Sequence, residues 1–351
     1  MTSAPAMTKG SADRAPNAQV LESLWSYVRA SGLHSLVLGA SKDPNAKITV
    51  LLVSPESGRP VFAIKVPTTD ASARAVETEA HVLRELEQFR LGQLVATIPR
   101  VVDLVDFDGR TAAVTTAVPG IPMTTSYLGW RHTRSAARVA ADFAAVGAWI
   151  ADFQRATAGE FANLDMDGGV SKRLRSRFSG VRDLDADLER LTGICDRLRS
   201  NRVPRTAVHG DFWSGNLLLD GGRLTGTVDW EAGSTLGEPV RDLVRFALMY
   251  ALYLDRRTRV GRRVAGHPGL VAGSWGAGVA YAFGGTGWFP ERFRGFLRDG
   301  LVRLGASPES WGDAALAGIA EVAAFTDDEA FARSHLELFR RLRGMEGARS
   351  T

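Results

Sequence analysis

The sequence predicts an α+β protein with two lobes, a small lobe built on an antiparallel sheet with one helix and a larger, mainly helical lobe. Three patterns predict this arrangement. Short β-type runs separated by turn residues occur up to residue 118. Long segments of helical periodicity follow Pro119-Gly120. Between those helices, residues 207–230 contain two short apolar runs around a turn, as in a β-hairpin.

The small lobe is expected over residues 20–118. Its expected strands are residues 35–38, 48–53, 61–66, 101–105 and 111–118. Asp108-Gly109 supplies the turn between the last two strands. A helix is expected over about residues 72–89, because apolar residues recur there at spacings of three and four. These residues are Val76, Ala80, Leu83 and Leu86.

The larger lobe is expected over residues 119–351. Its clearest helix runs from about residue 137 to residue 157, where apolar residues form a stripe on one face. The stripe consists of Val139, Phe143, Val146, Ile150 and Phe153. The hairpin is expected to pair residues 217–219 with residues 224–228 across the turn Asp220-Gly221-Gly222.

Composition restricts the class of protein. The 351 residues are 45% hydrophobic and 23% charged, which suits two packed lobes. A formal net charge of +4 is too small to indicate a nucleic acid partner. No run of about 18 apolar residues occurs, so no membrane partner is expected. Cys195 is the only cysteine, which excludes an intramolecular disulfide, favours the cytoplasm and leaves oxygen ligands for any metal.

Two stretches receive no catalytic role from the sequence. The chain begins with a segment rich in Ala, Ser, Thr and Pro, and residues 1–19 are expected to form a disordered tail. Residues 255–263 are rich in arginine. Such a stretch could contact acidic lipid or a polyanion, whereas a solvated loop between helices is the expected structure.

The catalytic motif lies over residues 209–216, which read H-G-D-F-W-S-G-N. They match the pattern H-x-D-x-x-x-x-N of a kinase catalytic loop, in which the Asp accepts the proton of the substrate and the Asn binds magnesium. The attacking hydroxyl and the metal-bound phosphate must lie on one line, so both groups must project from one short, rigid loop. We therefore expect Asp211 to be the proton acceptor and Asn216 a metal ligand.

A second carboxylate follows the hairpin, in the segment T-V-D-W-E over residues 227–231. A kinase carries its second metal-binding Asp at this point, and a carboxylate is a hard oxygen ligand that suits magnesium. The alternative is an ordinary aspartate at a strand end. Because the motif of residues 209–216 precedes it, Asp229 is expected to bind the metal.

These motifs, together with G-E-P-V-R-D-L over residues 237–243, resemble the aminoglycoside phosphotransferase family of kinase-like enzymes. The resemblance covers roughly residues 24–342 and is strong over residues 207–243. It implies a protein-kinase-like fold and an ATP- and magnesium-dependent transfer of the γ-phosphoryl group to a hydroxyl of a small molecule. Family members act on aminoglycosides, other antibiotics, choline, homoserine or sugars, so the resemblance implies a reaction type and not an acceptor.

The strand V-F-A-I-K over residues 61–65 resembles the kinase strand whose lysine holds the α- and β-phosphates. Lys65 needs a carboxylate partner on the following helix for this role. Glu79 lies three residues after Val76, on the apolar face of that helix, whereas Glu77 points away. An inward carboxylate needs a positive partner, so we expect Lys65 and Glu79 to form an ion pair.

The resemblance also implies supporting residues. Asp242 would anchor the backbone of the catalytic loop, and His209 would be a packed support. The segment that contains Ala117 lies where a hinge would hold adenine, although a plain strand followed by a turn fits equally well. Residues 38–45 contain a single glycine and lack G-x-G-x-x-G, which argues against a protein kinase. Relatives often carry Leu-His where this chain has Phe153-Gln154.

The acceptor is the least constrained part of the prediction. An acidic cluster, Asp327, Asp328 and Glu329, would favour a cationic acceptor such as an aminoglycoside or amino sugar if it faced the acceptor. The alternative is a helix N-terminus, with Thr326 as its cap. A catalytically inactive nucleotide-binding protein and a kinase of choline or homoserine are the rival functions. The sequence does not separate ATP from GTP, and it leaves the oligomeric state open.

Overall fold

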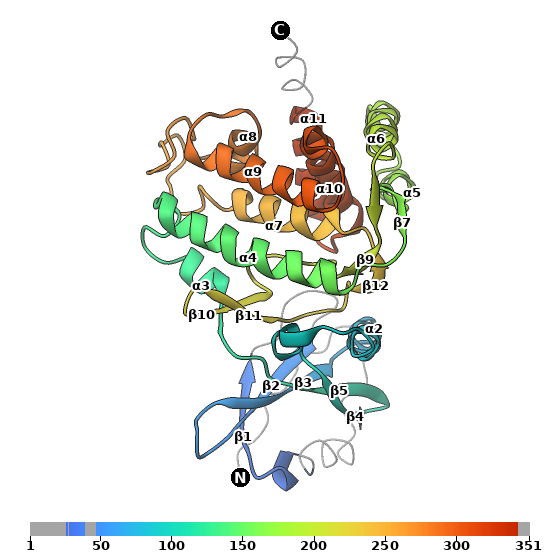
Figure 1. Ribbon diagram of the computed structural model, residues 1–351, viewed down its shortest axis with the longest axis vertical. Helices are drawn as coiled ribbons and strands as arrows, with labels where there is room; N and C mark the ends of the chain where they lie inside the picture. Colours follow the sequence, from blue (N-terminus) through green and yellow to red (C-terminus); the bar gives the residue numbers. More distant parts are fainter. Residues whose placement is uncertain (1–25, 27, 39–46, 343–351) are drawn as a thin grey trace. The chain divides into compact units, whose positions relative to one another are not determined.

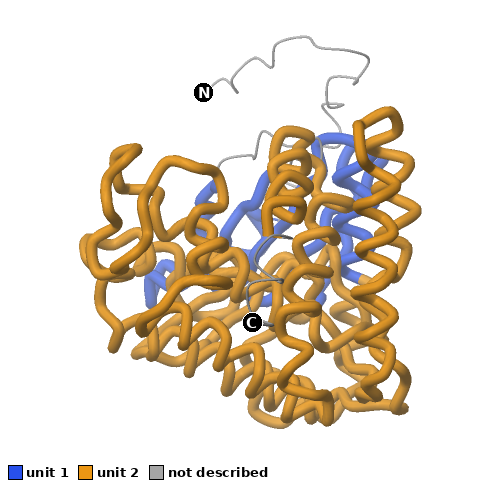
Figure 2. The backbone as a smooth tube through the Cα atoms, turned by 90° about the horizontal axis from the view of Figure 1, so that it is seen from above, with its two compact units in different colours: residues 1–80, 101–117 blue, residues 81–100, 118–351 orange. Residues whose placement is uncertain are grey.

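The structure, a computed structural model, describes residues 26, 28–38 and 47–342 of the chain. The expected tail, residues 1–19, and most of residues 38–45 lie outside the described residues. The chain divides into two compact units, one up to residue 80 together with residues 101–117, and the other with residues 81–100 and from residue 118 onward (Figure 2). The second division of the chain falls after residue 117, and residues 81–100 belong to the second unit.

The first unit contains a five-stranded antiparallel sheet (Figure 1). Its strands, in sheet order, are β1 (His34–Leu38), β2 (Lys47–Val53), β3 (Pro60–Pro67), β5 (Arg110–Thr116) and β4 (Val101–Phe107). All five predicted strands are present, with ends shifted by a few residues. The predicted turn is confirmed: Asp108 and Gly109 have φ of 53° and 70° and join Phe107 to its partner Arg110.

Successive side chains of a strand point to opposite faces of the sheet, and one face carries the main core of this unit. Leu52, Ile64 and Val114 are fully buried on neighbouring strands. Helix α2 (Asp70–Leu86) follows β3, and Ser72 accepts hydrogen bonds from the backbone of Thr68 and Thr69 at its start. The helix ends three residues earlier than predicted.

The second unit is mainly helical. Its longest described helix, α4 (Ala136–Ala156), is capped by Ser135 and buries the predicted stripe of Val139, Phe143, Val146, Ile150 and Phe153. Helix α9 packs on α4 and α7 (Figure 1). The other described helices are η1 (Gly92–Thr97), α3 (Met123–Tyr127), α5 (Val170–Arg177), α6 (Leu184–Leu198), α7 (Val240–Leu252), α8 (Ala277–Gly284), α9 (Trp288–Arg303), η2 (Pro308–Ser310), α10 (Trp311–Phe325) and α11 (Glu329–Arg341).

Short strands pair within this unit. The predicted hairpin is confirmed as β10 (Leu217–Asp220) and β11 (Arg223–Thr227), joined by Gly221 and Gly222, which both have positive φ. The other strands are β6 (Ile121–Pro122), which pairs with β10, β9 (Thr206–Val208) with β12 (Ser234–Gly237), and β7 (Phe161–Asn163) with β8 (Arg202–Pro204).

Side-chain contacts explain why residues 81–100 belong to the second unit. Trp149 Nε1 of α4 donates a hydrogen bond to Thr97 Oγ1 over 2.8 Å, and Thr227 Oγ1 donates to the carbonyl of Thr97. The hydroxyl of Thr235 donates to Glu85 over 3.0 Å. These partners are distant in sequence, so local periodicity could not predict them.

Candidate active site

The predicted ion pair of the first unit is confirmed. Lys65 Nζ lies 2.5 Å from Oε1 and 2.6 Å from Oε2 of Glu79, and both side chains are buried. Glu77 is exposed, so the predicted phase of the helix is correct. The pair is positioned because the apolar face of α2 packs on the sheet, where Val76 and Ala80 contact Ala113 of β5, the residue that pairs with Lys65 of β3. Lys65 lies within β3 and does not end it, since Val66 and Pro67 continue the strand.

Residues 209–216 form a loop between β9 and β10 in the second unit, and Asp242 of α7 anchors it. Asp242 accepts the backbone N–H groups of His209 over 2.7 Å and Gly210 over 2.9 Å. Burial raises the pKa of the Asp242 carboxyl, while the nearby His209 and the two backbone hydrogen bonds lower it. The anchoring contact expected of Asp242 is therefore present.

Gly210 is required at its position by two independent features. Its φ is 79°, in the left-handed region that favours glycine. A Cβ added there would lie 2.0 Å from the carbonyl oxygen of Ala232, which is backbone and cannot rotate away. The loop can therefore approach the segment after Asp229 closely only with glycine at this position.

His209 is a fully buried support. Its Nε2 donates to the carbonyl of Val228 over 2.9 Å, and its Nδ1 accepts the N–H of Asp211 over 3.3 Å. The ring also contacts Phe212 and Trp230, with centroids 5.8 and 4.5 Å away. Because both nitrogens bond the backbone, the geometry fits the support expected of His209.

Four N–H groups surround the Asp211 carboxylate. Arg245 donates to Oδ1 from Nε over 3.1 Å and from Nη2 over 2.6 Å. Trp213 Nε1 and Asn216 Nδ2 donate to Oδ2 over 3.2 and 3.0 Å. The side chain remains 32% exposed. Asp211 is thus fixed in orientation and still accessible, as a proton acceptor must be.

Asn216 and Asp229 are brought together by the hairpin that separates them in sequence. Leu217 pairs with Thr227, and the N–H of Val228 donates to the carbonyl of Asn216 over 2.9 Å. Asp229 is therefore the next residue in the chain after Val228, whose backbone bonds to Asn216. Its φ of 65° is uncommon for a residue with a Cβ, and such strain concentrates at functional sites.

The donors at these two positions fit magnesium. Asn216 uses its amide nitrogen to bond the carbonyl and carboxylate of Asp211, and within the described chain its amide oxygen accepts no hydrogen bond. Asp229 adds a carboxylate. Magnesium takes oxygen ligands, keeps several waters and needs few protein groups. No group of three or more His, Cys, Asp and Glu placed to hold a metal occurs among the described residues.

The residues expected to bind adenine and the acceptor form contacts within the protein that compete with these roles. The N–H of Ala117 donates to the carbonyl of Val61 over 2.9 Å, as in a continuing strand, so that donor is engaged. Asp328 caps α11 by accepting the N–H of Phe331 over 2.9 Å, and Glu329 pairs with Arg177 over 2.9 Å. The helix N-terminus alternative is therefore observed, with Asp328 rather than Thr326 as the cap.

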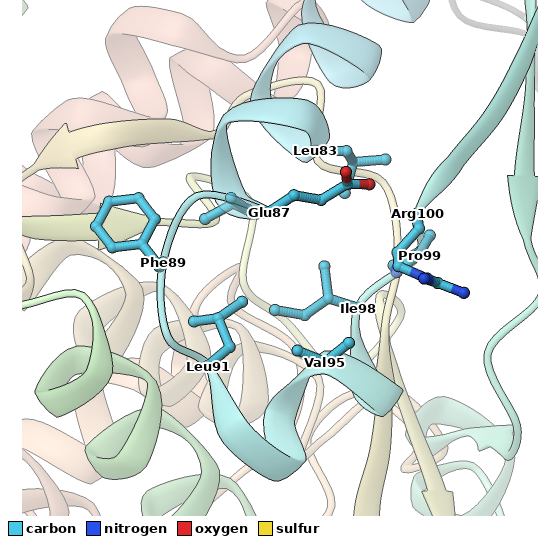
Figure 3. Close-up of a pocket in the computed structure, with 9 residues that line it drawn as sticks. Leu83, Glu87, Phe89, Leu91, Val95, Ile98, Pro99 and Arg100 are labelled. Carbon is cyan, nitrogen blue, oxygen red and sulfur yellow. The ribbon is translucent and has the colours of Figure 1, made fainter.

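A cavity of about 260 Å³ at the end of α2 is separate from the catalytic loop (Figure 3). It is lined mainly by apolar side chains, and Glu87 and Arg100 are its charged residues. None of the residues that the sequence assigned to catalysis or metal binding lines it.

The described helices include none with the length and apolar character that a membrane span requires.

Sequence reasoning missed Arg245 and Trp213. Arg245 lies three residues after Asp242, so it occupies the same face of α7 and points toward the loop that Asp242 anchors. That spacing could have indicated from the sequence that Arg245 contacts the same loop. Trp213 lies inside the motif itself, but its contact with Asp211 depends on the loop conformation.

Comparison with known proteins gives one family. The model of the phosphotransferase enzyme family matches residues 49–277. No curated protein sequence matches the chain significantly.

Many solved structures match the chain, and three of them illustrate the shared fold at low sequence identity. Aminoglycoside phosphotransferase APH(4)-Ia is 14% identical with a TM-score of 0.55, and the match covers 92% of this chain and 99% of that chain. The streptomycin–ATP complex of APH(2")-IIa is 15% identical with a TM-score of 0.53, covering 93% and 96%. ADP-bound APH(2'')-Ib is 15% identical with a TM-score of 0.52, covering 92% and 97%. The predicted kinase-like fold is confirmed.

Proposed function

Because the chain belongs to the phosphotransferase enzyme family, we propose that it transfers the γ-phosphoryl group of ATP to a hydroxyl of a small molecule. One observation carries this proposal. A single loop and hairpin present an accessible carboxylate, Asp211, beside the oxygen donors of Asn216 and Asp229. Phosphoryl transfer needs a proton acceptor and metal-binding oxygens in such proximity.

Asp211 orients the acceptor hydroxyl and takes its proton. The hydroxyl oxygen forms a bond to the γ-phosphorus while the bond from that phosphorus to the β–γ bridging oxygen breaks, and ADP leaves. The four N–H groups around Asp211 hold the carboxylate in one orientation during this step. Most of the rate enhancement then comes from positioning and electrostatics, as in other phosphoryl transfers.

Asn216 and Asp229 would hold magnesium, which neutralises charge on the phosphate oxygens when bound. Lys65 would bind the α- and β-phosphates, and Glu79 holds its ammonium group in place. Ala117 would contribute its main-chain carbonyl to the adenine, since its N–H bonds Val61. The structurally similar APH(2")-IIa forms a ternary complex with streptomycin and ATP, which supports ATP as the nucleotide here.

A nucleotide-consumption screen of the purified protein tests the proposal. The acceptors are aminoglycosides, peptide antibiotics, amino sugars, choline and homoserine, which also covers the rival acceptors. We expect Asp211→Asn to retain nucleotide affinity and lose at least about a hundredfold in kcat, since only the proton acceptor is removed. Asp220→Asn, on the exposed end of the same hairpin, is the matched control.

Two results would contradict the proposal. Wild-type turnover in Asp211→Asn would show that another group accepts the proton. Nucleotide binding without consumption in the presence of any acceptor would favour the inactive nucleotide-binding alternative.

A further inference from the structure

The arginine-rich loop after α7 forms a cavity with the segment after α3. The cavity has a volume of about 260 Å³ and is lined by residues between Tyr127 and Arg134 and between Tyr253 and Ala265. Its charged lining residues are Arg131, Arg134, Arg256 and Arg257, and its lining contains no Asp or Glu. The sequence alone predicted a solvated loop here, and the cavity is a feature of the tertiary structure.

The four guanidinium groups are not neutralised by carboxylates. Within the described part of the chain none of them forms an ion pair, whereas Arg197, Arg245 and Arg340 each pair with an aspartate. Arg131 instead lies 4.0 Å from the ring centroid of Trp130, and Arg256 lies 5.7 Å from that of Tyr253. The lining therefore carries an excess of positive charge.

Neighbouring acids are engaged elsewhere. Asp142 accepts hydrogen bonds from His132 over 2.7 Å and from the hydroxyl of Tyr250 over 2.6 Å. Asp255 accepts the backbone N–H of Gly273 over 3.4 Å. Neither carboxylate lines the cavity, but burial and the charges of both carboxylates raise the pKa of the Tyr127 hydroxyl in its wall, so their charges act there as well. Four guanidinium groups in the lining against two carboxylates outside it leave the wall positively charged.

Contacts to backbone carbonyls hold the loop, α7 and the segment after α3 together. His267 Nε2 donates to the carbonyl of Thr133 over 2.7 Å. A Cβ at Gly266 would lie 2.7 Å from the carbonyl oxygen of Arg134, so the loops touch backbone to backbone there. The buried hydroxyl of Tyr127 donates to the carbonyl of Tyr250 over 2.7 Å. A wall fixed in this way is preorganised, which lowers the ordering cost of binding.

The cavity lies beside the catalytic loop. The ring of Tyr253, which lines the cavity, is 6.5 Å from the ring of Trp213, whose Nε1 donates to Asp211. Burial raises the pKa of the Tyr253 hydroxyl, Arg256 and Arg245 lower it, and Asp211 raises it. Tyr253 thus experiences charges from both the cavity and the catalytic loop.

We propose that this cavity binds an anionic group, a carboxylate or a phosphate, of the acceptor whose hydroxyl is phosphorylated at Asp211; this inference rests on the proposed function. Guanidinium groups match both anions with charge-assisted, bidentate hydrogen bonds. The volume lies just below the roughly 300–1,000 Å³ of pockets that enclose a whole ligand, so it suits one substituent of a larger molecule. Four unpaired guanidinium groups would repel an ammonium group, which disfavours a cationic acceptor at this position.

Binding of small anions to the nucleotide-free, full-length protein tests the inference independently of turnover. The probes for isothermal titration calorimetry are inorganic phosphate, glucose 6-phosphate, glucuronate, glucose and glucosamine. We expect one or more of the three anions to bind, and glucose and glucosamine to bind more weakly. The variant Arg256→Gln/Arg257→Gln should weaken anion binding at least about tenfold, because two charge-assisted contacts are lost. Stronger binding of glucose 6-phosphate than of glucuronate would assign the site to phosphate, and the reverse to carboxylate.

The matched control is Arg262→Gln/Arg263→Gln, from the same loop but outside the lining of the cavity. It should bind the anions within about twofold of the wild type, because neither side chain lines the cavity. Equal weakening in both double variants, or no binding of any anion by the wild type, would overturn the inference. Anion binding without turnover of any acceptor, with glucuronate and glucose 6-phosphate included among the acceptors, would contradict the proposed function and leave this cavity standing as an anion site.

Discussion

Arg245 holds one oxygen of the Asp211 carboxylate with two of its N–H groups, over 3.1 and 2.6 Å. The Arg245 side chain is 23% exposed, and the residue lies one turn after Asp242, which anchors the backbone of the same loop. Helix α7 therefore fixes both the backbone of the loop over residues 209–216 and the carboxylate of Asp211. This double attachment makes α7 the element on which the geometry of the site depends.

Replacing Arg245 should affect turnover more than nucleotide binding. In Arg245→Met the Asp211 carboxylate loses two of its four donors, and we expect kcat to fall by about ten- to a hundredfold with KM for ATP within about twofold. Arg245→Lys should recover part of the loss, since it restores the charge without the fork of donors. Steady-state kinetics with Arg333→Met, an exposed arginine of α11, as the control provides the measurement. A fall in ATP affinity with unchanged kcat would contradict a positioning role.

Asp229 should be required for metal-dependent nucleotide binding. In Asp229→Ala one of the two proposed magnesium ligands is lost, so the increase in nucleotide affinity on adding magnesium should disappear. Fluorescent-nucleotide titration with and without magnesium measures it, and Asp220→Ala on the same hairpin is the control. A normal magnesium response in Asp229→Ala would mean that the metal is held elsewhere.

Glu79 and Glu77 lie on the same helix, one buried and one exposed, so replacing each of them separates the effect of the ion pair from that of the helix. Glu79→Ala removes the buried carboxylate that holds Lys65, and we expect a loss of roughly 3 kcal/mol of stability together with impaired catalysis. Glu77→Ala changes an exposed residue and should stay within about 0.5 kcal/mol of the wild type. Urea unfolding measures the stability of the two variants, and kcat/KM for ATP measures their catalysis. Similar effects of both changes would mean that the ion pair has no special role.

His335 should make stability depend on acid pH. Burial lowers its pKa from 6.5 to about 4, so the folded state favours the neutral ring. The stabilising contribution is therefore present above about pH 6.5 and is lost as the pH falls toward 4. Between pH 7 and 4.5 the wild type should lose about 2 kcal/mol more than His335→Gln.

Denaturant unfolding at a series of pH values measures this difference. His81→Gln, whose side chain is 70% exposed, should follow the wild type and serves as the control. Parallel curves for the wild type and His335→Gln would show that the buried imidazole does not govern the acid sensitivity.

Asp328 should contribute to stability rather than to acceptor choice. Loss of the N-cap in Asp328→Ala should cost about 1 kcal/mol and leave the ratio of kcat/KM for cationic and neutral acceptors unchanged. Glu337→Ala, an exposed change within the same helix, is the control for stability. If the triple variant Asp327→Asn/Asp328→Asn/Glu329→Gln lost a cationic preference without losing stability, the acidic cluster would bind the acceptor after all.

The sequence by itself determined the five strands of the first unit, helices α2 and α4 and the hairpin, and it placed Asp211, Asn216 and Asp229 on one loop and hairpin. It also determined that Glu79 points inward while Glu77 does not. These features depend on local causes, since periodicity sets which face of a helix is buried and turn residues set where a strand reverses. The catalytic loop and hairpin are likewise compact segments in which neighbours in sequence remain neighbours in space.

Only the tertiary structure decided which partners meet across long stretches of chain. Arg245 reaches Asp211, and Tyr127 bonds Tyr250, 123 residues away, beside a cavity built from two separate loops. The same applies to residues 81–100, whose contacts assign them to the second unit. Such pairings depend on how helices pack, because side chains distant in sequence meet only where burial of apolar faces brings their elements together.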